Sequence, residues 1–215
     1  MSAAVNDKLL VAMSQLAYCA DPPTVPGFDV ATIDDQPTDT QGIVAHDTHG
    51  NLVVAIRGSQ QFRDWWYSML FIRRYRLPQG ARCHRKWWRA AQSVGRLLLG
   101  HAQDAKTIYL TGHSLGGAVA YLLALWMWQM GVTARIVVVT FGSPCPGNDE
   151  CARQVLGSCG VTRRYVHVGD SVAGLPLGSW WAPIGHAISI GTHDLNPVND
   201  HSMAGYVRAM QDVDQ

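Results

Sequence analysis

The chain has 215 residues, of which 47% are hydrophobic and only 15% are charged. This composition excludes disordered and coiled-coil proteins, because both classes carry far more charge or a periodic bias. The formal net charge of +1 excludes a uniformly basic nucleic-acid-binding protein. A chain of this length buries about 70% of its unfolded surface on folding. We therefore expect residues 1–215 to form a single domain.

Apolar residues at helical spacing predict a first helix over residues 4–18. The stretch 21–40 is rich in proline and aspartate and is predicted to be a loop. Two strands, at 42–45 and 52–57, are predicted on either side of a polar turn. Further along, we expect helices at 85–100, 114–130, 149–157 and 200–211, and strands at 107–111, 135–141, 163–168 and 184–190. Strands that alternate with helices predict an α/β fold, with a mostly parallel central sheet and helices on both faces.

The amino-terminal residues bear on the cellular location. Residues 9–13 are apolar, but Ser14 and Gln15 follow them, so the stretch is too short and too polar for a signal peptide. The longest apolar run, residues 118–128, is shorter than the roughly 18 residues of a membrane-spanning helix. We therefore predict a cytoplasmic location, with secretion by another route left open.

Cysteine usage gives little evidence of cross-links or metals. The five cysteines leave at least one thiol unpaired, and no C-x-x-C motif occurs. Cys151 and Cys159 are close enough along the chain to pair, but we expect free thiols. Neither a metal ion nor an organic cofactor is predicted.

The strongest functional signal is a G-x-S-x-G motif centred on Ser114. A predicted strand runs into the motif and an apolar helix leaves it, which is the context of a nucleophile elbow. Gly112 and Gly116 leave room for the strand and the helix while the serine adopts a strained turn. The start of the helix then offers N–H groups to a developing oxyanion. The alternative interpretation is a glycine-rich helix start in which Ser114 is only an N-cap.

A serine nucleophile needs a base, and the base needs an acid that orients it. In hydrolases of this fold the chain order is serine, acid, histidine. Asp170 follows the predicted strand 163–168, whose carboxyl end faces the ligand-binding edge of the sheet, and is the predicted acid. For the base we favour His201, at the start of the last helix, over His193 in an ordinary turn. We expect changes at His193 and Asp200 to cost little.

Several segments together carry a family resemblance. They are Ala17-Tyr18-Cys19, Val54-Ala55-Ile56-Arg57-Gly58-Ser59, Asp64-Trp65, Gly112-His113-Ser114-Leu115-Gly116-Gly117, Phe141-Gly142-Ser143-Pro144, Tyr165-Val166 with Asp170, and His201-Ser202 with Tyr206. Through them the chain resembles the class 3 lipases, which are fungal-lipase-like α/β-hydrolases. The resemblance implies a serine carboxylester hydrolase acting on acylglycerol or other lipid esters, with Ser114, Asp170 and His201 as its triad. It also implies an oxyanion hole formed by the N–H groups of Ser59 and Leu115.

Residues 62–89 form a second feature, with eight basic residues, one acidic residue and interleaved aromatic residues. Arginine with tryptophan and tyrosine is typical of a surface that contacts a lipid interface. We predict that this segment is a lid that contacts lipid, with Trp65 and Trp66 facing the acyl chain or the membrane. The alternative is that half of these aromatic residues are ordinary core. Nothing else in the chain supports a nucleic-acid partner.

The basic segment leaves two other functions open. A phospholipase A1-like enzyme would use it to bind anionic phospholipid. A catalytically idle protein would keep the fold and bind lipid or a polyanion through the same residues. Hydrolysis of soluble esters separates the enzymes from the idle protein.

Overall fold

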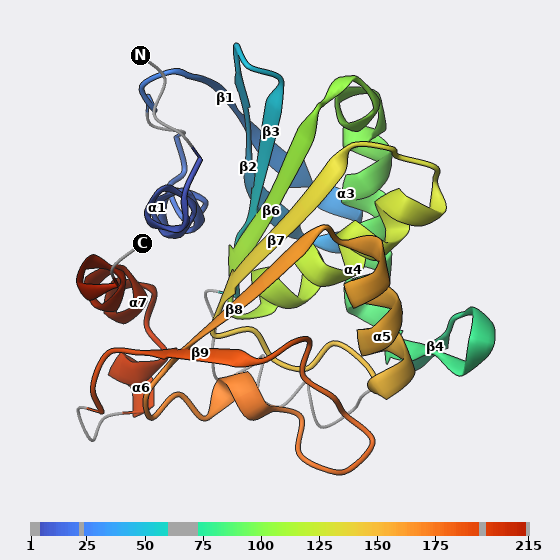
Figure 1. Ribbon diagram of the computed structural model, residues 1–215, viewed down its shortest axis with the longest axis vertical. Helices are drawn as coiled ribbons and strands as arrows, with labels where there is room; N and C mark the ends of the chain where they lie inside the picture. The colour runs from blue at the N-terminus through green and yellow to red at the C-terminus, as the bar shows by residue number, and fades with distance from the viewer. Residues whose placement is uncertain (1–4, 22–23, 60–72, 194–196, 214–215) are drawn as a thin grey trace.

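The computed structural model describes residues 5–21, 24–59, 73–193 and 197–213. Seven strands form a central sheet in the order β1-β2-β3-β6-β7-β8-β9 (Figure 1). The β1–β2 and β2–β3 pairs are antiparallel, and every later pair in this sheet is parallel. The predicted α/β-hydrolase architecture, with a mostly parallel sheet, is therefore confirmed.

The strands of the central sheet are β1 (Phe28–Asp35), β2 (Thr40–Asp47), β3 (Asn51–Ile56), β6 (Thr107–His113), β7 (Arg135–Phe141), β8 (Val161–His167) and β9 (Ala187–Ile190). A separate hairpin pairs β4 (Arg74–Arg76) with β5 (Arg82–His84). The helices are α1 (Asp7–Leu16), α3 (Arg85–Asp104), α4 (Leu115–Gln129), α5 (Asp149–Ser158), α6 (Pro197–Asp200) and α7 (Met203–Ala209). Short 3₁₀ turns include one at Gln36–Thr38, between β1 and β2.

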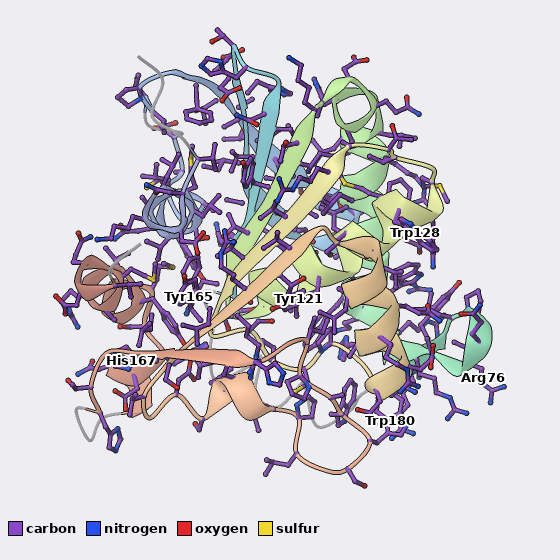
Figure 2. The ribbon with its side chains drawn as sticks, viewed as in Figure 1. Arg76, Tyr121, Trp128, Tyr165, His167 and Trp180 are labelled. Atoms are coloured by element: carbon purple, nitrogen blue, oxygen red, sulfur yellow. The ribbon has the colours of Figure 1, made fainter. Side chains whose placement is uncertain are left out.

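Helices cover both faces of the sheet, with α1 and α7 on one side and α3, α4 and α5 on the other (Figure 1). Successive strand residues point to opposite faces, so each buried strand supplies two cores. In β3, Val54 and Ile56 pack into the core under α3 and α4, whereas Val53 packs into the core under α1. Tyr121 and Tyr165 mark these two cores on opposite sides of the sheet (Figure 2).

Helix α4 lies in the middle of the larger core and is apolar almost all round. Its residues from Gly116 to Met127 are buried, and Trp128 beyond them is 56% exposed. A helix that is apolar on every side is stable only inside a packed core. Among the helices that the structure describes, we find none with the length and hydrophobicity of a transmembrane span.

Two predicted elements differ from the structure. The prediction of a loop over residues 21–40 is wrong, because Phe28–Asp35 forms β1 and pairs along its whole length with β2. This strand lies at the sheet edge, where one side faces water and tolerates aspartate, and the prolines that suggested a loop flank it. The predicted last helix is divided into α6 and α7, and His201 lies between them.

The cysteines are free thiols, as expected. The neighbour of Cys151 is Cys83 rather than Cys159. A hydrogen bond with Cys151, together with burial, raises the pKa of the Cys83 thiol. The pairing suggested by sequence proximity is therefore not the one that the fold favours.

The contact between α3 and α4 depends on a missing side chain. A Cβ atom at Gly95 would lie 2.2 Å from the buried ring of Trp126, whereas one at Gly100, in the same helix, would meet nothing within 4 Å. We expect Gly95→Ala to lower the free energy of unfolding by about 1–3 kcal/mol through overpacking. Gly100→Ala should raise it by about 0.5–1 kcal/mol, since alanine favours the helix.

Urea unfolding of the two variants checks this prediction. The comparison is matched because the substitution and the helix are the same. Equal midpoints for Gly95→Ala and wild type would contradict the close packing of the two helices.

Candidate active site

Ser114 occupies the sharp turn between β6 and α4. Its backbone has φ 56° and ψ −128°, a conformation that non-glycine residues rarely adopt. A Cβ atom at Gly116 would lie 2.0 Å from the carbonyl oxygen of Ile56, and one at Gly112 would lie 2.5 Å from the backbone of Gly116. Only glycine fits at these two positions. The turn has the strained geometry that the sequence motif predicts for a nucleophile elbow.

His201 connects the serine to the predicted acid. Its Nε2 atom lies 2.9 Å from the Ser114 hydroxyl oxygen, and its Nδ1 atom lies 2.8 Å from a carboxylate oxygen of Asp170. Because an ionised carboxylate only accepts hydrogen bonds, Nδ1 carries the proton. Nε2 is then an acceptor for the serine proton. The structure thus brings together all three predicted residues, which come from different elements, and all three are buried.

The carboxylate of Asp170 has two further donors. The Tyr206 hydroxyl donates to Oδ2 at 2.6 Å, and the backbone N–H of Val172 donates to Oδ1 at 2.9 Å. Burial by itself raises the pKa of Asp170, but the hydrogen bonds from His201, Tyr206 and Val172 outweigh it and lower the pKa below its ordinary value. Asp170 is therefore ionised at neutral pH, as an acid that orients an imidazole must be.

Sequence reasoning did not assign Tyr206, although it lies in the family-like segment that begins at His201. Its separation of five residues from the histidine reflects the turn into α7. The signal was present, but a tyrosine in an amphipathic helix is far more often a packing residue than a hydrogen-bond donor to a buried acid. Its role became visible only when Asp170 was placed beside it.

A second buried network connects His201 to the loop that follows β3. The Nε2 atom of His113 lies 2.8 Å from the carbonyl oxygen of His201, so this nitrogen donates. Nδ1 then accepts from the Tyr18 hydroxyl at 2.9 Å, and that hydroxyl accepts the N–H of Gly58 at 3.1 Å. Burial raises the pKa of Tyr18 to about 12, which keeps the hydroxyl protonated. His113 points into the core, as expected, whereas Tyr18 was not assigned a role from sequence.

The predicted oxyanion-hole residues lie next to the elbow. Ser59 follows β3 after Gly58, and Leu115 is the first residue of α4. A Cβ atom at Gly58 would lie 2.8 Å from the His113 carbonyl and 3.2 Å from the Ser114 Cβ atom, so the end of β3 packs against the elbow. Leu115 and Ser59 line the same cavity. Their backbones are thus close to the serine from two sides.

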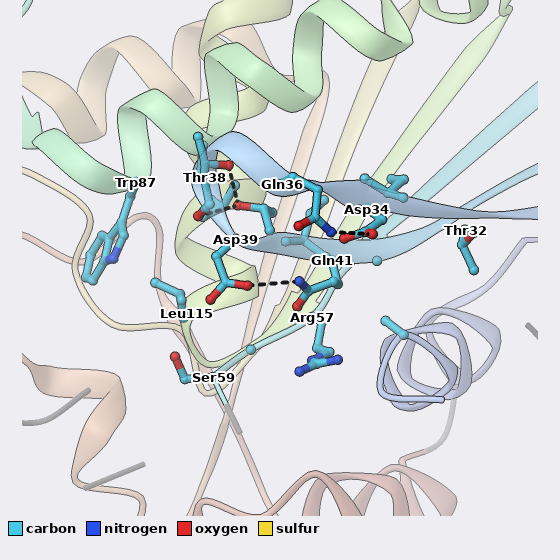
Figure 3. Close-up of a pocket in the computed structure, with 18 of the residues that line it drawn as sticks. Thr32, Asp34, Gln36, Thr38, Asp39, Gln41, Arg57, Ser59, Trp87 and Leu115 are labelled. Atoms are coloured by element: carbon cyan, nitrogen blue, oxygen red, sulfur yellow. Dashed lines mark hydrogen bonds between the residues drawn. The ribbon is translucent and has the colours of Figure 1, made fainter. Parts of the chain in front are cut away.

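That cavity has a volume of about 880 Å³ and extends from Gly58 and Ser59, after β3, to the β1–β2 turn (Figure 3). Apolar side chains, including Leu115, Val119 and Trp87, line one part of it. Polar side chains line the rest: Thr32, Asp34, Gln36, Thr38, Asp39, Gln41 and Arg57. Amide groups there donate to neighbouring carboxylates, Gln36 to Asp34 and Gln41 to Asp39 (Figure 3). Ser114 and His201 do not line this cavity, which approaches them through Leu115 and Ser59.

The predicted lid covers residues 62–89, of which the structure describes residues 73–89. Trp65 and Trp66 lie outside the described residues. Trp87 and Trp88 are 5% and 2% exposed and belong to the core face of α3, so they do not form part of an outer, membrane-contacting surface, although Trp87 lines the cavity. Arg74, Tyr75, Arg76 and Arg82 of the β4–β5 hairpin are exposed.

A strained nucleophile elbow at the end of a parallel strand, with an aspartate and a histidine from later loops, defines an α/β-hydrolase fold with a serine-centred site. The chain belongs to the class 3 lipase family, "Lipase (class 3)", whose pattern matches residues 53–180. That match includes Ser114 and Asp170, and His201 lies beyond it.

Individual relatives agree with the family. "Secreted mono- and diacylglycerol lipase 1" of Fusarium solani is 31% identical over 141 residues, covering 62% of this chain and 42% of that protein. "Lipase" of Rhizomucor miehei is 30% identical over 149 residues, covering 64% of this chain and 41% of that protein. The chain thus spans about two fifths of the length of these curated relatives.

Solved structures share the fold. A triacylglycerol lipase described as having a serine protease triad superposes with a TM-score of 0.75 at 24% identity, covering 85% of this chain and 78% of that one. A mono- and diacylglycerol lipase from Aspergillus oryzae gives 0.68 at 24% identity, covering 88% and 80%. At such identities the likeness establishes the fold.

The prediction of a cytoplasmic location is wrong. Relatives from Fusarium solani and Penicillium cyclopium are named as secreted lipases, which contradicts that prediction. The short apolar stretch that we interpreted as unlike a signal peptide belongs to α1, whose apolar side packs against the sheet. Its polarity reflects that packing role and carries no information on cellular location.

Two buried histidines make folding stability depend on pH. Burial lowers the pKa of His113 to about 3 and that of His84 to about 4. Below pH 6.5 a histidine of the unfolded chain binds a proton that the folded chain excludes. The folded state is therefore most stable with respect to these histidines above pH 6.5, and its free energy of unfolding decreases as the pH falls. We expect His113 to make the free energy of unfolding of the wild type fall by about 1.4 kcal/mol per pH unit between pH 6 and pH 4, and His113→Gln to abolish this part of the decrease.

Urea midpoints of wild type, His113→Gln and the exposed control His49→Gln at pH 7.5, 6 and 5 measure this effect. Glutamine keeps a donor for the His201 carbonyl, which limits other damage. Parallel pH dependence in all three proteins would refute the buried, neutral state of His113.

Proposed function

We propose that this protein is a serine carboxylester hydrolase that acts on acylglycerol or other lipid esters. The observation that carries the proposal is the double hydrogen bond of His201, to Ser114 at 2.9 Å and to Asp170 at 2.8 Å. An N-cap serine at a glycine-rich helix start has no need of a buried histidine and an ionised carboxylate in line with it. The same proposal treats residues 1–215 as one α/β-hydrolase domain without a cofactor.

In the first half of the reaction, Ser114 Oγ attacks the ester carbonyl carbon while Nε2 of His201 takes its proton. Asp170 holds the imidazole in the tautomer with Nδ1 protonated and stabilises the imidazolium that forms. The negative charge that develops on the carbonyl oxygen is stabilised by the N–H groups of Leu115 and Ser59. One such donor is worth about 2.7–4 kcal/mol of transition-state stabilisation in a comparable site.

The imidazolium then donates its proton to the leaving alkoxide, and the acyl group remains on Ser114. Water enters, His201 Nε2 accepts its proton, and the resulting hydroxide attacks the acyl carbon. The carboxylic acid leaves and Ser114 recovers its proton from His201. Each group is thus returned to the state seen in the structure.

Two features support lipid esters as the substrate class. Relatives of the chain are named as mono- and diacylglycerol lipases. The cavity beside the oxyanion loop has an apolar part for an acyl chain and a polar part for hydroxyl groups. A phospholipase A1-like activity is the second candidate, favoured by the exposed arginines of the β4–β5 hairpin.

Substitution of the three residues tests the chemistry. We expect Ser114→Ala, Asp170→Asn and His201→Ala each to lower kcat on p-nitrophenyl butyrate by about 10⁴-fold or more, because the triad acts as a unit. The melting temperature of Ser114→Ala should stay near that of wild type, since the turn is held by its glycine neighbours.

Ser189→Ala, at an exposed serine of β9, is the matched control and should keep full activity. A fluorophosphonate should label Ser114, as shown by peptide mapping. A wild-type protein that hydrolyses neither p-nitrophenyl butyrate nor p-nitrophenyl palmitate would establish the idle lipid-binding protein instead. If the wild type is active, the ratio of its rates on p-nitrophenyl butyrate and p-nitrophenyl palmitate separates an esterase from a lipase.

We further propose that residues 62–89 contact a lipid interface, through the described surface formed by Arg74, Tyr75, Arg76 and Arg82, the basic hairpin surface. The Arg74 guanidinium lies 4.1 Å from the ring centre of Trp180, a cation–π contact. Arg76 and Trp180 lie at the same edge of the molecule (Figure 2). Basic groups beside an exposed aromatic edge suit an anionic membrane surface.

The basic hairpin surface predicts salt-sensitive binding. Replacement of Arg74, Arg76 and Arg82 by glutamine should weaken binding to phosphatidylglycerol vesicles by about 100-fold, since each arginine contributes about 1 kcal/mol. Wild-type binding should weaken between 50 and 500 mM salt and be weaker on phosphatidylcholine. Arg96→Gln, at an exposed arginine of α3, is the control. Vesicle co-sedimentation measures the binding, and salt-independent binding equal on both lipids would refute the proposal.

A further inference from the structure

Asp200, the residue immediately before His201, is a carboxylate with no exposed surface. It ends α6, and its relative exposure is 0%. Moving a carboxylate out of water is costly unless hydrogen-bond donors or opposite charges replace the lost hydration. A buried charge directly beside the proposed general base therefore requires a reason.

Two histidines face this carboxylate. Nδ1 of His193 lies 2.6 Å from Oδ2, and Nδ1 of His167 lies 3.4 Å from Oδ1. The His167 nitrogen also lies 2.9 Å from the carbonyl oxygen of Val168, which can only accept. His167 Nδ1 therefore carries a proton and presents an N–H to the carboxylate side of the cluster. His193 donates the shorter hydrogen bond, from a side chain that is 44% exposed.

His167 lies at the end of β8, just before the acid, whereas His193 and Asp200 lie in the segment that carries the base. His167 ends β8, three residues before Asp170, and is labelled in Figure 2. His193 follows β9, and Asp200 adjoins His201. The Asp200 carboxylate thus joins the loop that carries Asp170 to the segment that carries His201.

Gly169 shows how closely these loops approach. Its φ is 90°, and a Cβ atom there would lie 2.1 Å from Nδ1 of His193 and 2.3 Å from Oδ2 of Asp200. No side chain fits between Asp170 and this cluster. A shift of His193 or Asp200 is therefore transmitted directly to the backbone beside Asp170.

We infer that Asp200 is a positioning residue for His201. Its hydrogen bond from His193 holds the shape of the segment that carries His201, and its contact with His167 holds that segment against the loop that carries Asp170. This inference rests on the proposed triad. Nothing in it requires Asp200 or His193 to touch the substrate. It reverses the expectation from sequence that changes at either residue cost little, because that expectation treated His193 as a residue of an ordinary turn.

Displacement of a reacting group by about 1 Å costs on the order of 100-fold in rate. We therefore expect His193→Ala to lower kcat on p-nitrophenyl butyrate by about 10-fold to 100-fold with KM changed less than about twofold. His193→Asn should restore most of the activity, since its amide nitrogen occupies the place of Nδ1 and donates the same hydrogen bond. Asp200→Asn should lower kcat to a similar extent as His193→Ala. The asparagine amide would place its NH₂ group against the N–H of either His193 or His167, where two donors cannot form a hydrogen bond.

His186→Ala, at an exposed histidine immediately before β9, is the matched control and should behave as wild type. The His193 pair keeps the test valid if Asp200→Asn fails to fold, because His193 is half exposed. Activity of His193→Ala within about twofold of wild type, or equal losses in His193→Ala and His193→Asn, would overturn the inference. Failure of the proposed function gives a different result, since wild type would then be inactive and unlabelled by fluorophosphonate.

Discussion

The positive φ of Ser114 is the constraint around which the site is arranged. A non-glycine residue in such a conformation costs on the order of 1–3 kcal/mol and persists only when its surroundings allow no relaxation. Here β6 enters the turn and α4 leaves it, and Gly112 and Gly116 let both elements contact the end of β3. The same close approach brings the loop carrying Ser59 beside the serine. The strain at Ser114 and the position of the Ser59 loop beside it therefore have one common cause.

Buried polar groups then connect the loops around the elbow. His113, in the motif itself, donates to the backbone of His201 and accepts from Tyr18, which in turn accepts from Gly58. Tyr206 donates to Asp170, and its hydroxyl also accepts the backbone N–H of His167. Buried networks of this kind are costly when incomplete and rigid when satisfied. Each loop that contributes a reacting group is thereby tied to at least one other.

The amphipathic helix α3 separates the residues of the basic and aromatic segment into a buried group and an exposed group. One side of the helix places Trp87 and Trp88 in the core, while Lys86 and Arg89 stay exposed. The basic and aromatic composition of residues 62–89 is thus only partly a surface property. Polar residues of β1 and of the turn after it contribute the hydrophilic part of the cavity beside Gly58 and Ser59.

The sequence by itself determined the alternation of strands and helices and the turn at Ser114, and it predicted Asp170 and His201 as the candidate acid and base. These depend on local signals, namely hydrophobic period, glycine spacing and chain order, which survive without knowledge of the fold. Only the tertiary structure decided that β1 is an edge strand, because its polar residues are stabilised by pairing with β2. It alone revealed Tyr18, Tyr206 and the Asp200 cluster, since their partners lie far away in the chain or in loops without periodicity. A buried hydrogen bond is a relation between two positions, and a sequence pattern describes each position separately.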